Sequence, residues 1–238
     1  METLAQPKHQ MRNLEDTFDW MSERYAAQTR AVSWGGYPAW LHRVANIIVA
    51  DHPRTLIDIG CGPGELLRIV GQQLPDCQLT GLDPSSAMLD HLPSQVRSYH
   101  DDLEHFSGGH QSEFDSAVMT FVLRDLHDPH LAVQQAAHLL RSGGHLVILE
   151  THTPHGWRAP GFRLYFHHLL PWWGDMRLTR DWPGSGHDAP YRWLSRTHQV
   201  WDRGESLAQW MNDAGLTKIQ RHSNPDEVIM IWSGQLRA

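Results

Sequence analysis

Residues 55–64 read Thr-Leu-Ile-Asp-Ile-Gly-Cys-Gly-Pro-Gly, an apolar run with one carboxylate that ends abruptly in glycines. A helical pattern begins at once, with Leu66, Leu67 and Val70 on one face. A buried strand, a tight turn and a helix in this order are typical of the first unit of an open α/β sheet. Ligands of such sheets bind outside the carboxyl ends of the strands, where glycines let a ligand approach the backbone. The stretch therefore predicts an α/β fold with a ligand at this turn.

The spacing of these glycines and a carboxylate further along the chain indicate which ligand the turn holds. Gly60, Gly62 and Gly64 form Gly-x-Gly-x-Gly, whereas the pattern that seats a pyrophosphate at a helix N-terminus is Gly-x-Gly-x-x-Gly. A second predicted strand, residues 78–82, leads into Asp83, where a carboxylate can accept hydrogen bonds from both hydroxyls of a ribose. A ribose without a pyrophosphate fits S-adenosylmethionine (SAM) better than NAD.

Composition excludes several classes of protein. The chain has 238 residues, 40% of them hydrophobic, which suits one domain with an appended lid. The net charge of −7, without any run of Lys and Arg, argues against nucleic acid as a partner. Cys61 and Cys77 have no paired spacing, so we expect neither a disulfide framework nor a bound metal. No apolar stretch has the length of a signal peptide or a membrane span, which predicts a cytoplasmic protein. The sequence does not determine the oligomeric state.

Hydrophobic periodicity divides the chain into four parts. Residues 1–50 carry two helical patterns, which we expect to cap the ligand end of the sheet. Residues 51–150 form the predicted SAM-binding core, with parallel strands near 55–59, 78–82, 96–99, 114–119 and 144–150. Residues 151–203 interrupt this alternation and predict a lid insertion after the fifth strand. Residues 204–238 predict a helix that stops at Gly215 and two closing strands, 216–221 and 227–232.

Two polar residues predict where helices begin. Ser85 can cap one helix, and Asp128 followed by Pro129 forms an N-cap and first-turn pair for another. We expect the helix after Asp128 to turn Leu131 inward and to stop at Gly143.

Residues 58–64, 81–85 and 139–150 resemble the successive motifs of class I SAM-dependent methyltransferases. The resemblance implies a Rossmann-like fold, a mostly parallel seven-stranded sheet with helices on both faces, and SAM as the cofactor. At the end of the third strand, Asp101 or Asp102 is expected to meet the adenine amino group, with Leu103 packed on the ring. The other cofactor contacts that the resemblance implies are Asp58, Gly60, Cys61, Gly62, Gly64, Asp83, Pro84, Met88 and Thr120. Tyr25 either reaches over the cofactor or packs as an ordinary core residue.

A narrower resemblance concerns residues 121–128, Phe-Val-Leu-Arg-Asp-Leu-His-Asp. They are similar to the Phe-Gly-Leu-Arg-Asn-x-x-Asp signature of the C-methyltransferases of ubiquinone and menaquinone biosynthesis. Residues 161–174 and 191–195 also resemble segments of that family, and the similarity spans roughly residues 15–235. It implies methyl transfer to carbon of a small, apolar aromatic or quinol-like acceptor. Asp125 replaces the family's Asn, and residues 156–160 and 182–188 also depart from the pattern, which leaves the acceptor open.

Methyl transfer requires an acceptor that is held in line with the methyl group and made nucleophilic. Removing the proton of a phenol makes its oxygen and its ortho carbon nucleophilic. The resemblance offers the Arg124 guanidinium as the group that favours the phenolate, and the alternative for Arg124 is a salt bridge to Asp125 or Asp128. His127, His152 and Asp125 are the candidate bases because each follows a predicted strand.

The aromatic-rich lid is expected to bind the acceptor through Tyr165, Trp173, Tyr191 and Arg192. An amphipathic helix over residues 162–170 could line this pocket, rest weakly on a membrane surface, or simply pack on the sheet. Three other functions stay open, since fold does not settle function. They are O- or N-methylation of a natural product, a SAM-binding cyclase that transfers no methyl group, and a SAM-binding subunit without activity.

Overall fold

A computed structural model describes residues 9–182, 189–201, 206–225 and 227–237 of the chain. A seven-stranded sheet forms its centre, in the order β3-β2-β1-β4-β5-β7-β6. The strands are β1 Thr55–Ile59, β2 Gln78–Asp83, β3 Arg97–His100, β4 Phe114–Thr120, β5 Leu140–Thr151, β6 Leu216–His222 and β7 Ile229–Leu236. The first five are parallel, whereas β7 runs antiparallel to both β5 and β6. The predicted class I methyltransferase fold is confirmed.

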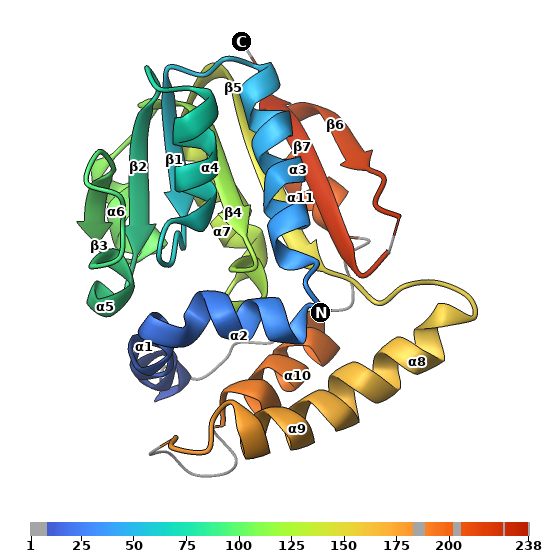
Figure 1. Ribbon diagram of the computed structural model, residues 1–238. Helices are drawn as coiled ribbons and strands as arrows, with labels where there is room; N and C mark the ends of the chain where they lie inside the picture. Colours follow the sequence, from blue (N-terminus) through green and yellow to red (C-terminus); the bar gives the residue numbers. More distant parts are fainter. Residues whose placement is uncertain (1–8, 183–188, 202–205, 226, 238) are drawn as a thin grey trace.

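Helices cover both faces of the sheet, as Figure 1 shows. On one face lie α3 Tyr37–Ala50 and α4 Glu65–Gln73; on the other lie α6 Leu103–Gly109, α7 Pro129–His138 and α11 Leu207–Asp213. Neighbouring residues of β1 alternate between these two layers, since Leu56 packs in the first and Ile57 in the second. Both side chains are fully buried, so the sheet is the middle layer of a three-layer core.

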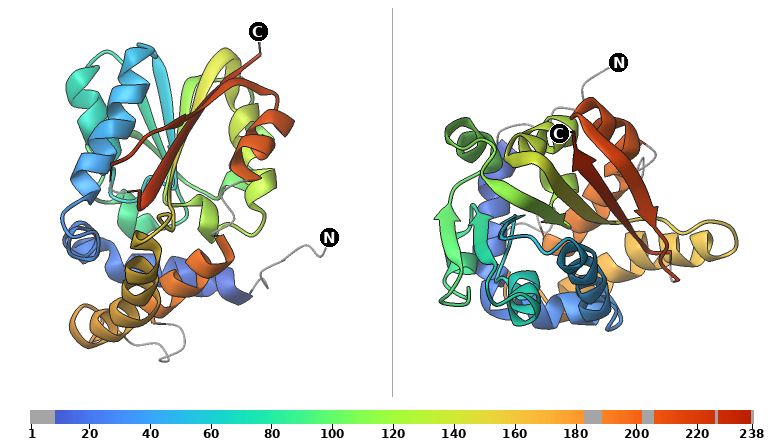
Figure 2. Two further views of the ribbon diagram at one scale, coloured as in Figure 1. Left: turned by 90° about the vertical axis from the view of Figure 1, so that its right-hand side faces the viewer. Right: turned by 90° about the horizontal axis from the view of Figure 1, so that it is seen from above.

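The N-terminal helices divide between two positions. Helix α1 His9–Met21, the short 3₁₀ turn η1 Ser22–Arg24 and α2 Tyr25–Val32 cross the carboxyl ends of the strands, as Figures 1 and 2 show. Helix α3 instead buries Leu41, Val44 and Ile48 against β1 and α4. The expectation that both predicted helices cap the ligand end is therefore wrong for α3, because its apolar stripe is continuous enough to cover the sheet face.

The segment after β5 forms a second group of helices at the same end. Helix α8 Arg158–Leu164 continues through a π-helical turn, η3 Tyr165–Leu169, into α9 Leu170–Arg177, and α10 Pro190–Trp201 packs beside it. The predicted helix over residues 162–170 is thus the middle of a longer one. Phe166, Leu170 and Tyr191 form a separate small core in this group. In the described part of the chain, no helix is long and apolar enough to cross a membrane.

The predicted helix starts are confirmed. The Ser85 hydroxyl accepts a hydrogen bond from the Met88 N–H at the start of the short helix α5 Ser86–Leu89, and Asp128 accepts one from Leu131 at the start of α7. Two details differ from the expectation. Leu131 is 43% exposed, and α7 ends at His138, so that Gly143 lies within β5. The early end has a physical cause, because Leu140 already pairs with Phe114 of β4.

Candidate functional site

The turn after β1 is built from glycines whose backbone is left-handed. Gly60 has φ +68° and Gly62 has φ +51°, a region that side chains rarely tolerate. A Cβ on Gly60 would lie 2.5 Å from Cγ2 of Val122, so the Val122 side chain leaves no space for a side chain at this position. A Cβ on Gly62 would meet nothing within 4 Å. Gly62 therefore faces open space, as a backbone that cradles a ligand must.

Asp83, at the end of β2, lies directly against this turn. Its carboxylate accepts hydrogen bonds from the Gly62 N–H at 2.8 Å and from the Ser85 N–H at 2.9 Å. Burial raises the pKa of Asp83, while the two N–H groups lower it. Each carboxylate oxygen has a second lone pair, so Asp83 keeps the capacity to accept two ribose hydroxyls.

Asp58 supplies the strongest sign that this end of the sheet holds a polar ligand. The residue is 1% exposed, and neither of its carboxylate oxygens has a hydrogen-bond partner in the part of the chain that the structure describes. Burial and the neighbouring Asp83 hold the pKa of Asp58 well above its ordinary value. A buried carboxyl group without a partner is rare and costly. SAM carries an ammonium and a sulfonium, so the open glycine turn, Asp83 and Asp58 fit it as a group.

Two neighbouring acids at the end of β3 have different partners. Asp102 caps α6, since its carboxylate accepts the His105 N–H at 2.8 Å. Asp101 instead bonds to the His105 ring, with 2.8 Å between its Oδ2 and Nδ1. Leu103 is buried beside them. Both acids are thus engaged, but the His105 ring that Asp101 contacts is 82% exposed and is more easily displaced than the N–H of a helix cap, so Asp101 is the acid that we retain for the adenine amino group.

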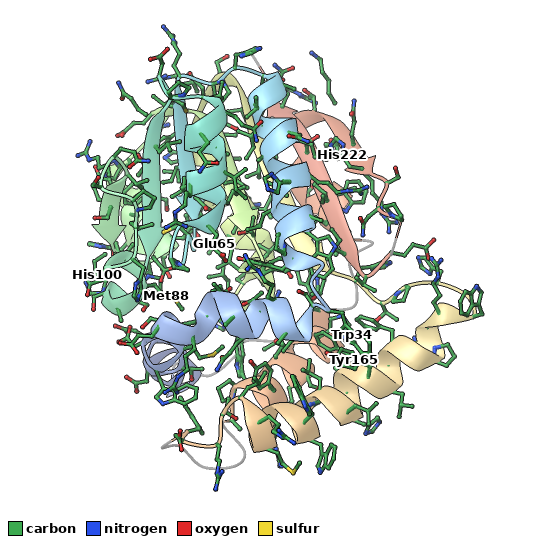
Figure 3. All side chains as sticks on the ribbon, viewed as in Figure 1. Trp34, Glu65, Met88, His100, Tyr165 and His222 are labelled. Atoms are coloured by element: carbon green, nitrogen blue, oxygen red, sulfur yellow. The ribbon has the colours of Figure 1, made fainter. Side chains whose placement is uncertain are left out.

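The remaining predicted cofactor residues lie around the same strand ends. Cys61 and Met88 are buried, Thr120 is half-buried at the end of β4, and Pro84 is exposed. Figure 3 labels Met88 on α5. The Ser85 hydroxyl donates a hydrogen bond to the Asp19 carboxylate of α1, which fastens the N-terminal helices to this edge.

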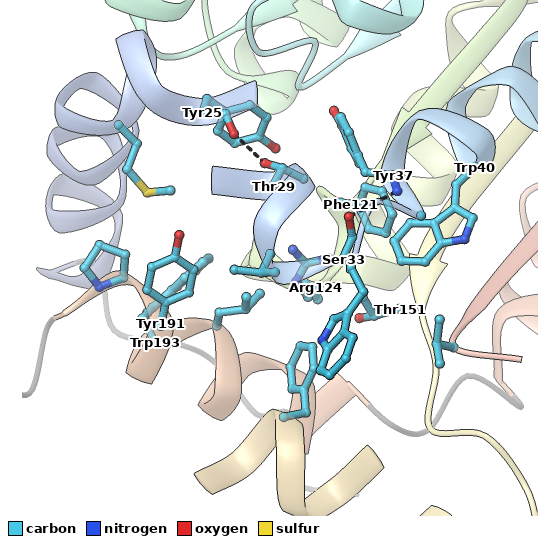
Figure 4. Close-up of a pocket in the computed structure, with 18 of the residues that line it drawn as sticks. Tyr25, Thr29, Ser33, Tyr37, Trp40, Phe121, Arg124, Thr151, Tyr191 and Trp193 are labelled. Carbon is cyan, nitrogen blue, oxygen red and sulfur yellow. Dashed lines mark hydrogen bonds between the residues drawn. The ribbon is translucent and has the colours of Figure 1, made fainter. Parts of the chain in front are cut away.

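A cavity of about 560 Å³ opens between the strand ends, the N-terminal helices and the lid helices. Figure 4 shows aromatic rings on most of its sides. Its aromatic lining consists of Phe18, Tyr25, Trp34, Tyr37, Trp40, Phe121, Phe162, Tyr165, Phe166, Tyr191 and Trp193. A cavity of this size and lining suits a flat, largely apolar small molecule.

Arg124 forms the polar wall of this cavity together with two carboxylates behind it. Its Nη1 lies 2.7 Å from Oε2 of Glu150, and its Nε lies 3.5 Å from Oδ1 of Asp125. The three side chains are 8%, 0% and 3% exposed. Burial opposes the charge on Arg124, but Glu150 and Asp125 outweigh it and raise the pKa of the guanidinium. Burial raises the pKa of Asp125 to about 8, against the opposing effect of Arg124.

Tyr25 stands between the cofactor residues and the cavity. Its ring lines the cavity, and its pKa is raised to about 12, mainly by burial. Arg124 lowers this pKa, whereas Asp125, Asp83 and Glu65 raise it. The Tyr25 hydroxyl is thus within electrostatic reach of both sites, which agrees with a position over the cofactor.

Tyr165 and Tyr191 line the cavity as predicted. The Tyr165 hydroxyl donates to the Val32 carbonyl at 2.9 Å, and its ring meets Trp34 edge-on at 5.6 Å between centroids. Figure 3 shows this pair where the end of α2 faces α8. The Tyr191 hydroxyl donates to Oε1 of Gln28 at 3.3 Å. Both hydroxyls thereby tie the lid to α2.

Five other predicted residues do not line the cavity, and one of them, Asp125, lies behind Arg124. His127 is exposed, and His152 lies beside His155 with 3.4 Å between their Nε2 atoms. Trp173 packs on the small core of the lid, and Arg192 is exposed and paired with Asp175. The assignments of the other four as bases or acceptor contacts stay predictions that the cavity does not support, because strand-end position and aromatic content do not determine the direction of a side chain.

Sequence reasoning also missed residues that the fold brings in. Glu150 is the penultimate residue of β5 and was part of a matched motif, yet nothing local indicated that it pairs with Arg124, 26 positions earlier. Phe121 has φ +59°, unusual for an aromatic residue, and this turns its ring toward Tyr37 and Trp40. An acid at the end of a parallel strand was the one signal that could have identified Glu150.

Comparisons with known proteins agree with this geometry. Residues 25–221 match the family described as "Methyltransferase domain". Demethylmenaquinone methyltransferases of Thermotoga maritima and Desulfitobacterium hafniense are 27% and 28% identical to the chain. The two alignments cover 87% and 93% of this chain and 88% and 89% of those proteins.

Solved structures share the fold. A SAM-dependent methyltransferase of Thermotoga maritima superposes with a TM-score of 0.62 at 16% identity, covering 93% of this chain and 99% of that one. A 1,6-didemethyltoxoflavin-N1-methyltransferase of Burkholderia thailandensis, solved with S-adenosylhomocysteine, gives 0.57 at 15% identity, covering 100% and 93%. With the family match over most of the chain and a strand-end site that fits SAM, the protein belongs to the methyltransferase-domain family and is a SAM-dependent methyltransferase.

Proposed function

We propose that the protein transfers a methyl group from SAM to a ring carbon of a small, apolar aromatic acceptor of the hydroquinone type. The observation that carries the proposal is the cavity of about 560 Å³, with largely aromatic walls and the charged side chain of Arg124. Both faces of an aromatic ring bound there are removed from water, while a hydroxyl group on the ring can accept a hydrogen bond from Arg124. The similarity to demethylmenaquinone methyltransferases favours a quinol and carbon as the methylated atom.

The residues of the cavity have two tasks in this proposal. SAM, when bound, supplies an electrophilic methyl group. The aromatic walls hold the acceptor in one orientation, which lowers the entropic part of the barrier. Arg124 donates to the acceptor oxygen and favours its phenolate form, which raises electron density on the ortho carbon.

Asp125 is the base that we retain among the three predicted candidates. Asp125, like His127 and His152, does not itself line the cavity, but it contacts Arg124, which does. A pKa of about 8 is close to the pH at which a general base works best. Glu150 holds Arg124 in place and is a positioning residue in this scheme.

A test incubates the protein with SAM and, separately, a short-chain demethylmenaquinol, a simple phenol and an aromatic amine. Mass spectrometry should find one added methyl group on the quinol and an equal amount of S-adenosylhomocysteine. The control is Asp83→Ala, which should lose turnover with every acceptor because it weakens the cofactor site. Methylation of the amine alone, or acceptor turnover without S-adenosylhomocysteine, would contradict the proposal.

A further inference from the structure

The long helix of the lid, α8 through α9, exposes large apolar side chains on the side away from the cavity. We call these the outer lid face: Trp157, Leu164, Leu169, Trp172 and Met176, between 47% and 85% exposed. Soluble proteins seldom expose several such side chains together unless the surface binds something. The clustering is notable because only two other large apolar side chains, Trp34 and Leu131, are as exposed in the described residues.

The geometry of the helix places these side chains on one side. Leu164 and Leu169 are one turn apart because the π-helical turn η3 adds a residue, and Trp172 and Met176 follow at helical spacing. The opposite side carries Phe162 and Phe166 into the cavity and buries Leu170. Figures 1 and 2 show the helix at the edge of the molecule, with the other elements on one side of it. One helix thus separates the cavity from the exterior.

The charges of this segment are strongly biased. Residues 157–180 contain four arginines and one aspartate, in a chain of net charge −7. The aspartate, Asp175, is paired with Arg192 of α10. Arg163 and Arg177 are exposed, and each is the sequence neighbour of a residue of the apolar row, Leu164 and Met176. Arg158 lies 4.0 Å from Glu227, so the surface combines exposed Trp, Leu and Met with positive charge that rests mainly on Arg163 and Arg177.

We propose that the outer lid face binds the surface of an anionic phospholipid bilayer. A helix with arginines flanking an apolar stripe lies in the plane of the interface, with its apolar side chains among the acyl chains and its cations at the phosphates. Charge complementarity selects an anionic lipid surface over a zwitterionic one. If the proposed function holds, only this helix separates an apolar acceptor dissolved in the bilayer from the cavity.

Vesicle sedimentation tests this without SAM or acceptor, so it is independent of the proposed activity. The whole protein is spun with phosphatidylcholine vesicles, or with vesicles that also contain phosphatidylglycerol. We expect at least tenfold stronger binding to the anionic vesicles, and loss of that preference at high salt. Arg163→Gln and Arg177→Gln should each weaken the partition coefficient about fivefold, the effect of one cation near such a surface.

Two matched control variants distinguish binding through this surface from nonspecific adsorption to the vesicles. Trp172→Ser should weaken binding several-fold, whereas Leu131→Ser, at an exposed leucine of α7, should not. Arg221→Gln, an exposed arginine of β6, is the control for the charge variants and should bind as the unmodified protein does. All variants are first checked for unchanged thermal unfolding.

Three results would overturn the proposal. They are no binding to anionic vesicles, equal binding to both kinds of vesicle, and loss of binding in the control variants as much as in the lid variants. Light scattering provides a further opposing outcome. If the protein is a dimer that Trp172→Ser converts to a monomer, the outer lid face is an interface between two copies of the chain.

Discussion

The guanidinium of Arg124 lies 2.7 Å from the carboxylate of Glu150, and the Glu150 side chain is completely buried. Glu150 also accepts the backbone N–H groups of Arg124, at 3.3 Å, and of Thr151, at 3.2 Å. The turn that follows β4 and the end of β5 are thereby joined by a charged pair at the wall of the cavity. The Arg124 side chain is consequently fixed in position by Glu150, which also partly neutralises its charge.

Removing Glu150 should therefore be costly. Glu150→Ala leaves the Arg124 charge buried and unpaired, and we expect a loss of about 3–5 kcal/mol in the free energy of unfolding. Glu150→Gln keeps a hydrogen-bond acceptor and should lose less. Urea unfolding measures both. The control is Glu113→Ala, whose ion pair with His110 is half-exposed and should change stability by no more than about 1 kcal/mol. If Glu150→Ala were as mild as Glu113→Ala, the pair would not hold the site.

Asp125 predicts a dependence of stability on pH. Its pKa rises from 3.8 to about 8 in the folded protein, so between those values the folded state holds a proton that the unfolded state releases. The contribution of Asp125 to stability is thus fully present below about pH 4 and is lost as the pH rises through about 8.

Asp125→Asn removes this titration while keeping the shape of the side chain. The stability of the variant relative to the unmodified protein should increase steadily from pH 5 to pH 8, measured by urea unfolding at each pH. The other titrating groups are shared by the two proteins and cancel in the difference. A difference that stays constant over this range would show that Asp125 is ionised throughout.

Asp101 and Asp102 should differ in what they affect. Asp101→Ala should weaken SAM binding by roughly 1–3 kcal/mol, the usual effect of a lost charged hydrogen bond. Asp102→Ala should leave SAM affinity within about twofold but destabilise the protein by about 0.5–2 kcal/mol, since it removes the cap of α6. Calorimetry and thermal unfolding of the two variants supply the comparison. The reverse pattern would assign the adenine contact to Asp102.

Gly60 should be intolerant of a side chain because of Val122. Gly60→Ala places a methyl group 2.5 Å from Cγ2 of Val122, at a left-handed φ of +68°. We expect about 1–3 kcal/mol from the contact and about 1–2 kcal/mol from the backbone. In a double-mutant cycle, Val122→Ala should recover part of the contact energy and none of the backbone part, because it removes Cγ2 but leaves the Val122 Cβ at 2.9 Å. Strictly additive effects would mean that the two residues do not collide.

Local patterns predicted the parts of this protein that depend on neighbouring residues. The glycine turn, the carboxylate of Asp83 and the caps at Ser85 and Asp128 each follow from a few adjacent positions, and the structure has them where they were expected. The parallel order of the strands followed from their alternation with helices.

The acceptor side was less predictable, because it depends on contacts between distant segments. Glu150 and Arg124 meet only once β4 and β5 pair, and the cavity needs α2 and the lid to face each other. Both Trp173 and Trp193 belong to the aromatic-rich lid segment, yet only Trp193 lines the cavity, whereas Trp173 packs on the small core of the lid. Which side of a helix points inward is decided by tertiary packing.

The account's central claim, that this cavity presents a ring carbon to the methyl group, is tested most directly by following that methyl group. SAM carrying a ¹³C-labelled methyl group is incubated with the protein and a short-chain demethylmenaquinol, and the product is examined by heteronuclear NMR. The account predicts that the labelled carbon has the chemical shift of an aryl methyl group, well upfield of a methoxy carbon, and that its protons correlate with several ring carbons. A label bound to oxygen, or no label in the quinol product while S-adenosylhomocysteine forms with another acceptor class, would contradict it.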